Sequence, residues 1–392
     1  MPDIRRPRIL LVTRNLPPLV GGMERLNWHM AEELAKHADV RVIGPDGSAA
    51  MAPTGVPVDE VPLKPLWKFL LHAPWRAWRV ARAWRPDVVL AGSGLTAPAT
   101  WFAARMSGAR TAAYVHGLDL AVRHPGYRAL WWPALRSMDR VIANSRATAA
   151  LARVVGVQPD RIGIVPPGVD LPVEPASTDA ARGTTEGSAV SDFRERHQLG
   201  HCPLLLSVGR LSTRKGLREF VTLALPGIVV AYPDALLLVV GDAPKDALHA
   251  QAQTPESIRL AAEQVGVARH LRFLGTITDY QELGAIYRAA DVHVFPVREL
   301  AGDPEGFGMV AVEAAAHGLP TVAFATGGVV DAVVEGRSGL LVSPGDYPAF
   351  ALAVQDALAQ REALRKPCEV FAARFAWPEF GAGVREVLFH ER

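Results

Sequence analysis

The hydrophobic residues of this chain gather in short continuous runs that recur at intervals long enough for a helix. Continuous runs, rather than alternating ones, are typical of strands that are buried on both faces. Strands that alternate with helical segments predict doubly wound parallel sheets. The runs are Ile9–Val12, Val40–Ile43, Val88–Ala91, Val141–Ala143, Ile162–Val165, Leu204–Val208, Ala235–Val240, Val292–Phe295 and Thr321–Phe324.

The series is interrupted between Leu171 and Asp192 by residues that are small, polar and aperiodic, as in a linker. We therefore predict an α/β protein with two Rossmann-like domains that face a cleft. The N-terminal domain spans residues 1–171, the linker 172–198 and the C-terminal domain 199–376. Ligands of such sheets bind beyond the carboxyl ends of the strands, so the loops that follow the strands are where chemistry is expected.

Composition narrows the classes of function. A length of 392 residues with 49% hydrophobic residues suits two packed domains. The net charge of +2 gives no global field for nucleic acid, and we expect no nucleic-acid partner. Cys202 and Cys368 form no CxxC pair, which disfavours a disulfide scaffold or structural zinc. No apolar stretch approaches the ~20 residues of a membrane span, so we expect a cytoplasmic protein, soluble or at a membrane surface.

The segment 304–320 (PEGFGMVAVEAAAHGLP) carries the strongest chemical signal. Helix formers at 309–317, followed by glycine and proline, predict a helix behind a glycine-containing loop. Glu305 lies in the loop and Glu313 about one turn inside the helix. Free amides at a helix start favour an anion such as a diphosphate, and carboxylates accept hydrogen bonds from sugar hydroxyls. The alternative is a capped helix with two surface glutamates.

The stretch from Leu271 to Val342 resembles the donor-binding half of retaining GT-B glycosyltransferases of family 4, which includes bacterial mannosyl- and glucosyltransferases. Three upstream segments resemble the same family: its pyrophosphate loop at Ser207–Leu217, its glycine loop at Pro17–Arg25 and its His-Gly-x-Asp segment at Val115–Asp119. The pieces that occur in the family's order are Arg272-Phe-Leu-Gly275, Leu283-Gly-Ala-Ile-Tyr-Arg-Ala-Ala-Asp291, Glu305 and Glu313 with seven residues between them, and Thr326-Gly-Gly328 followed by Gly339-Leu-Leu-Val342.

The resemblance implies a GT-B fold and a set of site residues. It places His116 near the transferred sugar and implies that the closing helix, 377–392, crosses back to the first domain. Arg210 and Lys215 put two cations where a leaving nucleoside diphosphate gains charge, although either residue alone is better interpreted as a surface cation in a strand–helix loop. The implied catalytic residues are His116, Glu305, Arg210 and Lys215. The implied donor-binding residues are Gly21, Gly22, Arg210, Lys215, Gly306, Phe307, Gly308, Met309 and Glu313.

The expected activity is retaining transfer of a hexose from a nucleotide-diphosphate sugar to a glycan or lipid-linked acceptor, in the synthesis of cell-surface polysaccharide or glycolipid. The preferred donor is GDP-mannose, which gives α-mannosyl transfer. UDP-glucose or UDP-N-acetylglucosamine are alternative donors. We expect no metal and no other cofactor, because no Asp-x-Asp motif occurs and two cations with helix amides can serve the diphosphate. The rival classes are a GT-B nucleotide-sugar 2-epimerase, a dinucleotide-dependent oxidoreductase, which the missing Gly-x-Gly-x-x-Gly disfavours, and an inactive nucleotide-sugar-binding partner.

The segment Lys64–Arg85 interleaves tryptophans with lysines and arginines and holds no acidic residue. Such a mixture is favourable at lipid headgroups, which implies a peripheral position on the inner face of the cell membrane and a lipid-linked acceptor. However, a three-residue spacing drifts by ~60° per step around a helix, so we predict no separate polar and apolar faces. The slightly favoured alternative is a helix whose tryptophans pack on its own sheet while the arginines face water.

Overall fold

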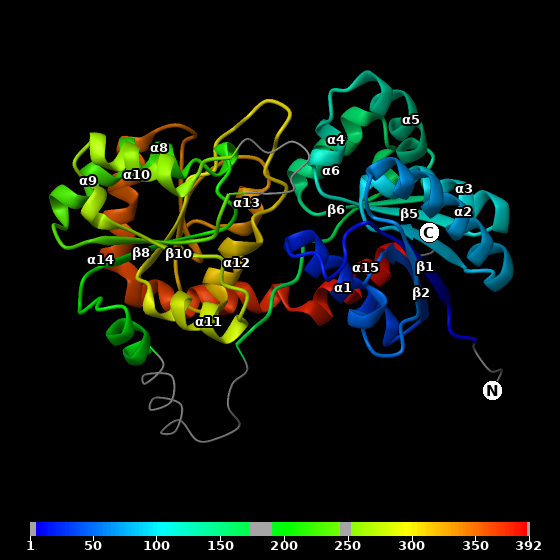
Figure 1. Ribbon diagram of the computed structural model, residues 1–392, viewed down its shortest axis with the longest axis horizontal. Helices are drawn as coiled ribbons and strands as arrows, with labels where there is room; N and C mark the ends of the chain where they lie inside the picture. The colour runs from blue at the N-terminus through cyan, green and yellow to red at the C-terminus, as the bar shows by residue number, and fades with distance from the viewer. Residues whose placement is uncertain (1–4, 173–189, 244–251, 390–392) are drawn as a thin grey trace. The chain divides into compact units, whose positions relative to one another are not determined.

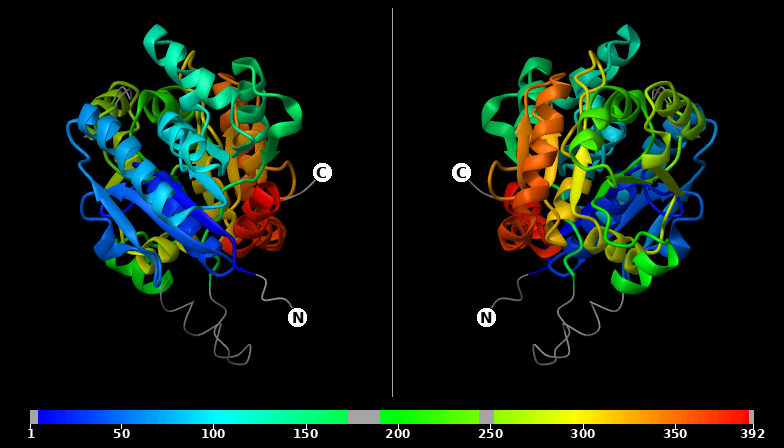
Figure 2. Two further views of the ribbon diagram at one scale, coloured as in Figure 1. Left: turned by 90° about the vertical axis from the view of Figure 1, so that its right-hand side faces the viewer. Right: turned by 90° about the vertical axis from the view of Figure 1, so that its left-hand side faces the viewer.

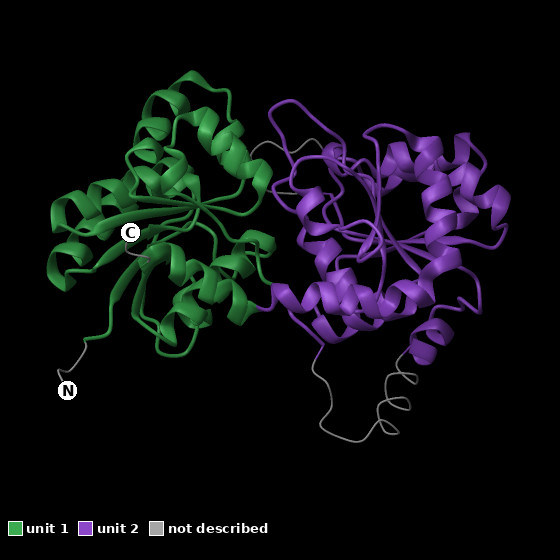
Figure 3. Ribbon diagram, turned by 180° about the vertical axis from the view of Figure 1, so that it is seen from behind, with its two compact units in different colours: residues 1–168, 377–392 green, residues 169–376 purple. Residues whose placement is uncertain are grey.

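The computed structural model describes residues 5–172, 190–243 and 252–389, and the chain divides into two compact units (Figures 1 and 3). Unit 1 consists of Met1–Gly168 and Trp377–Arg392, and unit 2 of Val169–Ala376. Each unit contains one sheet whose strands are all parallel. The predicted fold class, two Rossmann-like α/β domains, is therefore confirmed.

Unit 1 is built on a seven-stranded sheet with the order β3-β2-β1-β4-β5-β6-β7. The order reverses between β1 and β4, so the loops after these strands flank the point where such sheets bind ligands. The elements are β1 (Arg8–Val12), α1 (Gly22–Ala35), β2 (Asp39–Pro45), β3 (Val58–Val61), α2 (Leu66–Trp84), β4 (Val88–Ala91), α3 (Ala97–Ser107), β5 (Arg110–Val115), α4 (Leu118–Ala121), α5 (Pro125–Arg136), β6 (Arg140–Ala143), α6 (Arg146–Val155), β7 (Ile162–Ile164) and α15 (Trp377–Phe389).

The helices of unit 1 cover both faces of its sheet. On one face α1 packs against α15, the last helix of the chain, as the blue and red ribbons of Figure 1 show. On the other face, α2 and α3 bury apolar residues against β1, β2 and β4, while α3, α5 and α6 do so against β4, β5 and β6. Because the central strands β1 and β4 are covered on both sides, their residues are largely apolar without alternation.

Unit 2 repeats this plan with a six-stranded sheet of order β10-β9-β8-β11-β12-β13, whose order reverses between β8 and β11. Within β8, Leu205 packs into the cluster on one face, while Leu204 and Leu206 pack on the other. The elements are β8 (Leu204–Val208), α8 (Leu217–Leu223), α9 (Leu225–Ala231), β9 (Leu236–Val240), α10 (Pro255–Gln264), β10 (Leu271–Gly275), α11 (Tyr280–Ala289), β11 (Val292–Phe295), α12 (Met309–Ala316), β12 (Thr321–Phe324), α13 (Val329–Ala332), β13 (Gly339–Val342) and α14 (Tyr347–Ala372).

The predicted linker, residues 172–198, is only partly described. Residues 173–189 lie outside the described residues. Residues 190–196 are helical, and within them Phe193 is buried against the core of unit 2. The end of the predicted linker is therefore part of unit 2, because an apolar side chain within it packs on the sheet.

Helix α2 has one buried, apolar face, which the sequence analysis did not predict, and an outer side that mixes tryptophans with basic residues. Phe69, Ala73 and Ala77 are buried against the sheet. Trp67 and Trp75 are 57% and 50% exposed on the outer side, so the interpretation that the tryptophans pack on the sheet is wrong for these two. The reason is geometric: residues four apart drift by only ~40° per step and stay on one face, whereas the three-residue spacing that we considered drifts further. Within the described part of the chain, no helix is long and apolar enough to cross a membrane.

Candidate active site

Two loops at the carboxyl ends of neighbouring strands form the centre of the candidate site in unit 2. One loop follows β8 and carries Arg210 and Lys215, and the other follows β11 and carries Glu305. Strands β8 and β11 pair directly at the point where the strand order reverses. The fold therefore brings together residues that are ninety positions apart: Nζ of Lys215 donates a hydrogen bond of 2.9 Å to Oε2 of Glu305.

This ion pair is largely shielded from water. The Glu305 side chain is 11% exposed and that of Lys215 19%. Burial by itself would raise the pKa of Glu305, but the nearby charges of Lys215 and Arg214 outweigh it and lower the pKa to about 2. Lys215 Nζ also lies 4.5 Å from the ring centroid of Phe295. Burial lowers the pKa of Lys215 from its usual value, and the neighbouring Glu305 carboxylate opposes that shift. At neutral pH the site therefore holds an ionised Glu305 carboxylate.

Arg214, which the sequence analysis did not single out, ties the two loops together. Its guanidinium donates a 2.7 Å hydrogen bond to the carbonyl of Pro304 and lies 3.6 Å from Oε2 of Glu305. Its carbonyl accepts a 2.8 Å hydrogen bond from the amide of Arg298. The sequence feature that could have identified Arg214 is its position next to Lys215, in a loop that already contains two predicted cations.

Arg210 occupies a different environment from Arg214. Its side chain is exposed, and among the described residues it forms no ion pair. Its charge still contributes to lowering the pKa of Glu305, after the larger effects of burial, Lys215 and Arg214. Of the predicted cations, Lys215 thus contacts Glu305 directly while Arg210 remains at the rim, facing water.

Close backbone contacts hold the Glu305 loop against the loop that follows β12. The amide of Gly328 donates a 2.9 Å hydrogen bond to the carbonyl of Glu305. A Cβ atom at Gly328 would lie 2.0 Å from the carbonyl oxygen of Gly306, so only glycine fits there. Gly308 has a φ of +100°, and a Cβ atom on it would meet the ring of Phe295 at 2.8 Å.

The predicted helix over 309–317 is confirmed as α12, Met309–Ala316. The predicted donor-binding residues in and before this helix differ in burial. Phe307 is 2% exposed and packs in the core, so it can present only its backbone to a donor. Met309 is partly buried against the same core. Glu313 is buried, and one of its carboxylate oxygens accepts a 3.1 Å hydrogen bond from the hydroxyl of Tyr287. The ring of Tyr287 stacks on His317, which donates a 2.9 Å hydrogen bond to the Glu313 carbonyl.

In unit 1, the predicted glycine loop follows β1 and is exposed. Gly21 precedes α1, whose first residue is Gly22. A Cβ atom at Gly21 would lie 2.4 Å from a carboxylate oxygen of Glu24, which folds back over the loop. The other Glu24 oxygen accepts a 2.6 Å hydrogen bond from the side chain of Asn15.

His116 lies just after β5 and is held by its neighbours in unit 1. Its Nε2 donates a 3.1 Å hydrogen bond to the carbonyl of Gly92, which leaves Nδ1 as an acceptor in the neutral ring. Asp119 accepts hydrogen bonds from the amides of His116, at 3.1 Å, and of Gly94, at 2.7 Å. The His-Gly-x-Asp segment therefore joins the loops after β4 and β5, with the histidine side chain partly exposed.

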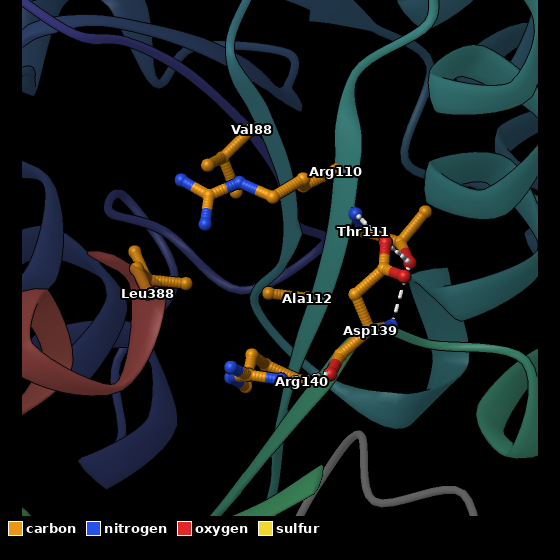
Figure 4. Close-up of a pocket in the computed structure, with 7 residues that line it drawn as sticks. All are labelled: Val88, Arg110, Thr111, Ala112, Asp139, Arg140 and Leu388. Atoms are coloured by element: carbon orange, nitrogen blue, oxygen red, sulfur yellow. Dashed lines mark hydrogen bonds between the residues drawn. The ribbon is translucent and has the colours of Figure 1, made fainter. Parts of the chain in front are cut away.

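A separate pocket of about 190 Å³ lies at the opposite end of the unit 1 sheet (Figure 4). Its residues belong to the amino-terminal ends of β4, β5 and β6 and to α15. Asp139 is already engaged there by the amide and hydroxyl of Thr111, both at 2.8 Å. Because ligands of such sheets bind at the carboxyl ends, we do not assign this pocket to the candidate active site.

Two family profiles match most of the chain. Residues 20–172 match the family described as "Glycosyltransferase Family 4". Residues 191–371 match the family described as "Glycosyl transferases group 1". The first match includes the loop that holds His116, and the second includes the loops that hold Lys215 and Glu305.

Characterised proteins similar to this chain are also glycosyltransferases. The chain is 31% identical over 371 residues to the GDP-mannose-dependent alpha-(1-6)-phosphatidylinositol monomannoside mannosyltransferase of Mycolicibacterium smegmatis, which covers 90% of this chain and 89% of that protein. It is 33% identical over 260 residues to D-inositol 3-phosphate glycosyltransferase 2 of Catenulispora acidiphila. That alignment covers 64% of this chain and 55% of the C. acidiphila protein.

Solved structures support the fold. Anabaena HepE in complex with UDP superposes with a TM-score of 0.76 at 19% identity, over 98% of this chain and 100% of that one. Sucrose-phosphate synthase of Thermosynechococcus elongatus gives a TM-score of 0.75 at 22% identity, over 97% and 98%.

Proposed function

Since the chain belongs to glycosyltransferase family 4 and is an enzyme that uses nucleotide sugars, we propose that it transfers a hexose with retention of configuration. The proposed donor is GDP-mannose. The proposed acceptor is a glycan or a lipid-linked sugar in the synthesis of cell-surface polysaccharide or glycolipid. The observation that carries the proposal is the Lys215–Glu305 pair, largely shielded from water, at the strand-order reversal of unit 2.

The charges around this pair suit the departure of a nucleoside diphosphate. As the bond between the anomeric carbon and the phosphate oxygen breaks, negative charge develops on the diphosphate. Lys215 and Arg210 supply positive charge from one loop, and Arg214 fixes that loop against the other. Fixed cations in a partly dry site stabilise such charge without reorganising during the reaction. Three clustered cations are also the reason why we propose catalysis without a metal ion.

The proposed mechanism is front-side attack, in which the acceptor approaches the anomeric carbon from the same face of the sugar as the leaving diphosphate. The acceptor hydroxyl forms the new bond to the anomeric carbon while the phosphate oxygen leaves, and the hydroxyl proton passes to that leaving oxygen. Glu305 is not a nucleophile here. It is held ionised and accepts hydrogen bonds from the hydroxyls of the transferred sugar.

The remaining site residues bind and orient the substrates. Glu313 holds the ribose of the donor, with Tyr287 fixing its carboxylate. The backbone of residues 306–309 and the glycines Gly21 and Gly22 approach the donor phosphates. His116 lies near the transferred sugar, oriented by its hydrogen bond to the Gly92 carbonyl.

The choice of GDP-mannose rests on relatives, since the mannosyltransferase of M. smegmatis is named for that donor. Structural neighbours bound to UDP favour uridine donors as the second candidate, with glucose or N-acetylglucosamine as the sugar. Both candidates use the same cations for the diphosphate and differ in the pocket for the base.

Calorimetry with UDP, GDP and ADP, with and without EDTA, tests the proposal. We expect one diphosphate, GDP, to bind with an affinity that EDTA leaves unchanged. Absence of binding by all three would contradict the donor site. A donor sugar altered in the absence of any acceptor would identify an isomerase instead, and a β-linked product from an α-linked donor would rule out retention.

A further inference from the structure

We infer that helices α2, α3 and α5 of unit 1 form a surface that binds bilayers containing anionic lipids. The inference deepens the proposed function and rests on it for its purpose, delivery of the enzyme to a lipid-linked acceptor. The surface itself can be tested without any sugar chemistry.

The three helices are neighbours on one side of unit 1. Helix α3 packs against both α2 and α5, and all three bury apolar residues on the same face of the unit 1 sheet. Figure 1 and the left panel of Figure 2 show α2 and α3 side by side over that sheet. Their outer sides therefore form one continuous surface that faces away from the core.

That surface exposes large apolar side chains on each helix. Those with the highest exposure on α2, Trp67, Leu71 and Trp75, repeat every four residues and lie on one face. Helix α3 adds Trp101, Phe102 and Met106, and α5 adds Leu130. A soluble monomer rarely collects so many exposed apolar side chains on adjacent helices, and such a patch marks an interaction site. The exposed fractions are 57%, 64% and 50% for the α2 residues, 38%, 41% and 53% for those of α3, and 59% for Leu130.

The charge of the same helices has one sign. The sequences of α2, α3 and α5 contain no aspartate or glutamate. Their basic residues are Lys68, Arg76, Arg79, Arg82, Arg105, Arg128 and Arg136. Over the chain as a whole, lysine and arginine number 42 against 40 acidic residues, so the imbalance is local to this surface.

Cations and tryptophans are also adjacent in space. The Arg79 guanidinium lies 4.7 Å from the ring centroid of Trp75, and that of Arg128 lies 4.0 Å from Trp132. Seven of the chain's nine tryptophans are on these helices: Trp67, Trp75, Trp78, Trp84, Trp101, Trp131 and Trp132. Tryptophan rings favour the headgroup level of a bilayer, and neighbouring cations there attract anionic lipids.

An anionic bilayer fits this surface better than a second copy of the chain. In a symmetric dimer each helix layer would meet its own equivalent, and basic residues would face basic residues. Asp59 already pairs with Arg76 at 3.0 Å, and the three helices themselves contribute no carboxylate to offset the other cations. A membrane supplies negative charge and an apolar layer together.

The test is sedimentation of the full chain with vesicles of phosphatidylglycerol and phosphatidylcholine, compared with phosphatidylcholine alone. We expect binding to the mixed vesicles, weakening as salt is raised, and little binding to the neutral ones. The double variant Lys68→Glu, Arg79→Glu should lower the partition coefficient by at least about 25-fold, because each basic residue lost weakens binding about fivefold. The double variant Trp67→Ser, Trp75→Ser should also weaken binding, and this loss should change less with salt concentration.

Matched variants on other exposed surfaces serve as controls. Arg153→Glu with Arg337→Glu changes the net charge equally, and Val230→Ser with Leu260→Ser removes exposed apolar side chains elsewhere. All four variants should keep the wild-type melting temperature and GDP affinity. The inference is overturned if the wild-type protein does not bind the mixed vesicles, or if the control variants lose as much binding as the variants in α2. It is also overturned if the substitutions in α2 change self-association instead of vesicle binding. Vesicle binding without GDP binding would support the membrane-binding surface and refute the proposed function.

Discussion

Lys215 and Glu305 are joined by a 2.9 Å hydrogen bond between Nζ and Oε2, across two loops that meet where the strand order of unit 2 reverses. Neither loop is rigid by secondary structure alone. The buried pair, together with the bond from Arg214 to the Pro304 carbonyl, fixes one loop against the other before any donor binds. Stability and function of this region are therefore coupled through the same charges.

Replacing Lys215 with methionine should destabilise unit 2 by about 3 kcal/mol, because Glu305 would remain buried with only Arg214 nearby. Adding Glu305→Gln should restore most of this loss, since Arg214 still pairs with Asp303 at 3.6 Å and no carboxylate is left without a cation. Urea unfolding at pH 7 measures both effects.

The control for that experiment is Lys366→Met. Lys366 pairs with Glu369 at 3.0 Å but is 76% exposed, and such pairs contribute at most about 0.5 kcal/mol. An equal loss in Lys215→Met and Lys366→Met would contradict the view that the buried pair organises the loops.

Acid should destabilise the protein in two stages. Burial, with a smaller effect of the Lys215 charge, lowers the pKa of His293 from 6.5 to about 3, so only the unfolded chain takes up this proton as pH falls from 6.5. Glu305, with a pKa lowered from 4.5 to about 2, adds a further loss as pH falls from 4.5 towards 2. Between pH 6 and 5, His293→Leu should reduce the slope of unfolding free energy by about 1.4 kcal/mol per pH unit. An unchanged slope would show that His293 titrates normally in the folded protein.

The sequence predicted strands such as Val88–Ala91 and Ala235–Val240 well, because these runs are apolar throughout and are buried on both faces of a sheet. It did not reveal β3, whose residues Val58–Val61 include two acidic side chains at a sheet edge. Glu305 and Lys215 were predicted from motif resemblance, but their direct contact depends on β8 pairing with β11, which no local pattern encodes. Arg214 was missed for the same reason, since its partner, the Pro304 carbonyl, is distant in sequence.

Gly328→Ala should disturb the Glu305 loop. Its new Cβ atom would lie 2.0 Å from the Gly306 carbonyl oxygen, so the two loops must separate. We expect GDP affinity to fall at least about tenfold, because the backbone amides near residue 306 would move. Gly227→Ala is the control. It lies on helix α9, where its Cβ would meet Ala351 at 3.5 Å, and should leave affinity unchanged while stabilising the helix by about 0.5–1 kcal/mol. Similar GDP affinities for the two variants would refute the loop contact.

Tyr287→Phe should raise the Michaelis constant for the donor about fivefold and leave kcat nearly unchanged, since the lost hydroxyl orients the Glu313 carboxylate rather than the reacting atoms. Tyr114→Phe removes a comparable buried hydroxyl, bonded at 2.8 Å to the Val165 carbonyl in unit 1. Steady-state kinetics should show no change in the Michaelis constant for Tyr114→Phe. The same rise in both variants would point to general destabilisation.

Glu305 is proposed to bind the transferred sugar while the sugar moves to the acceptor, and the Glu305→Gln variant is the sharpest test of that role. The substitution keeps the shape of the side chain and removes its charge. With GDP-mannose as donor, kcat should fall at least about 100-fold while the dissociation constant for GDP changes less than about threefold. Glu33→Gln, which alters another buried carboxylate paired with a lysine at 2.7 Å, should keep the wild-type rate. Full activity in Glu305→Gln would show that the Glu305 carboxylate takes no part in sugar transfer.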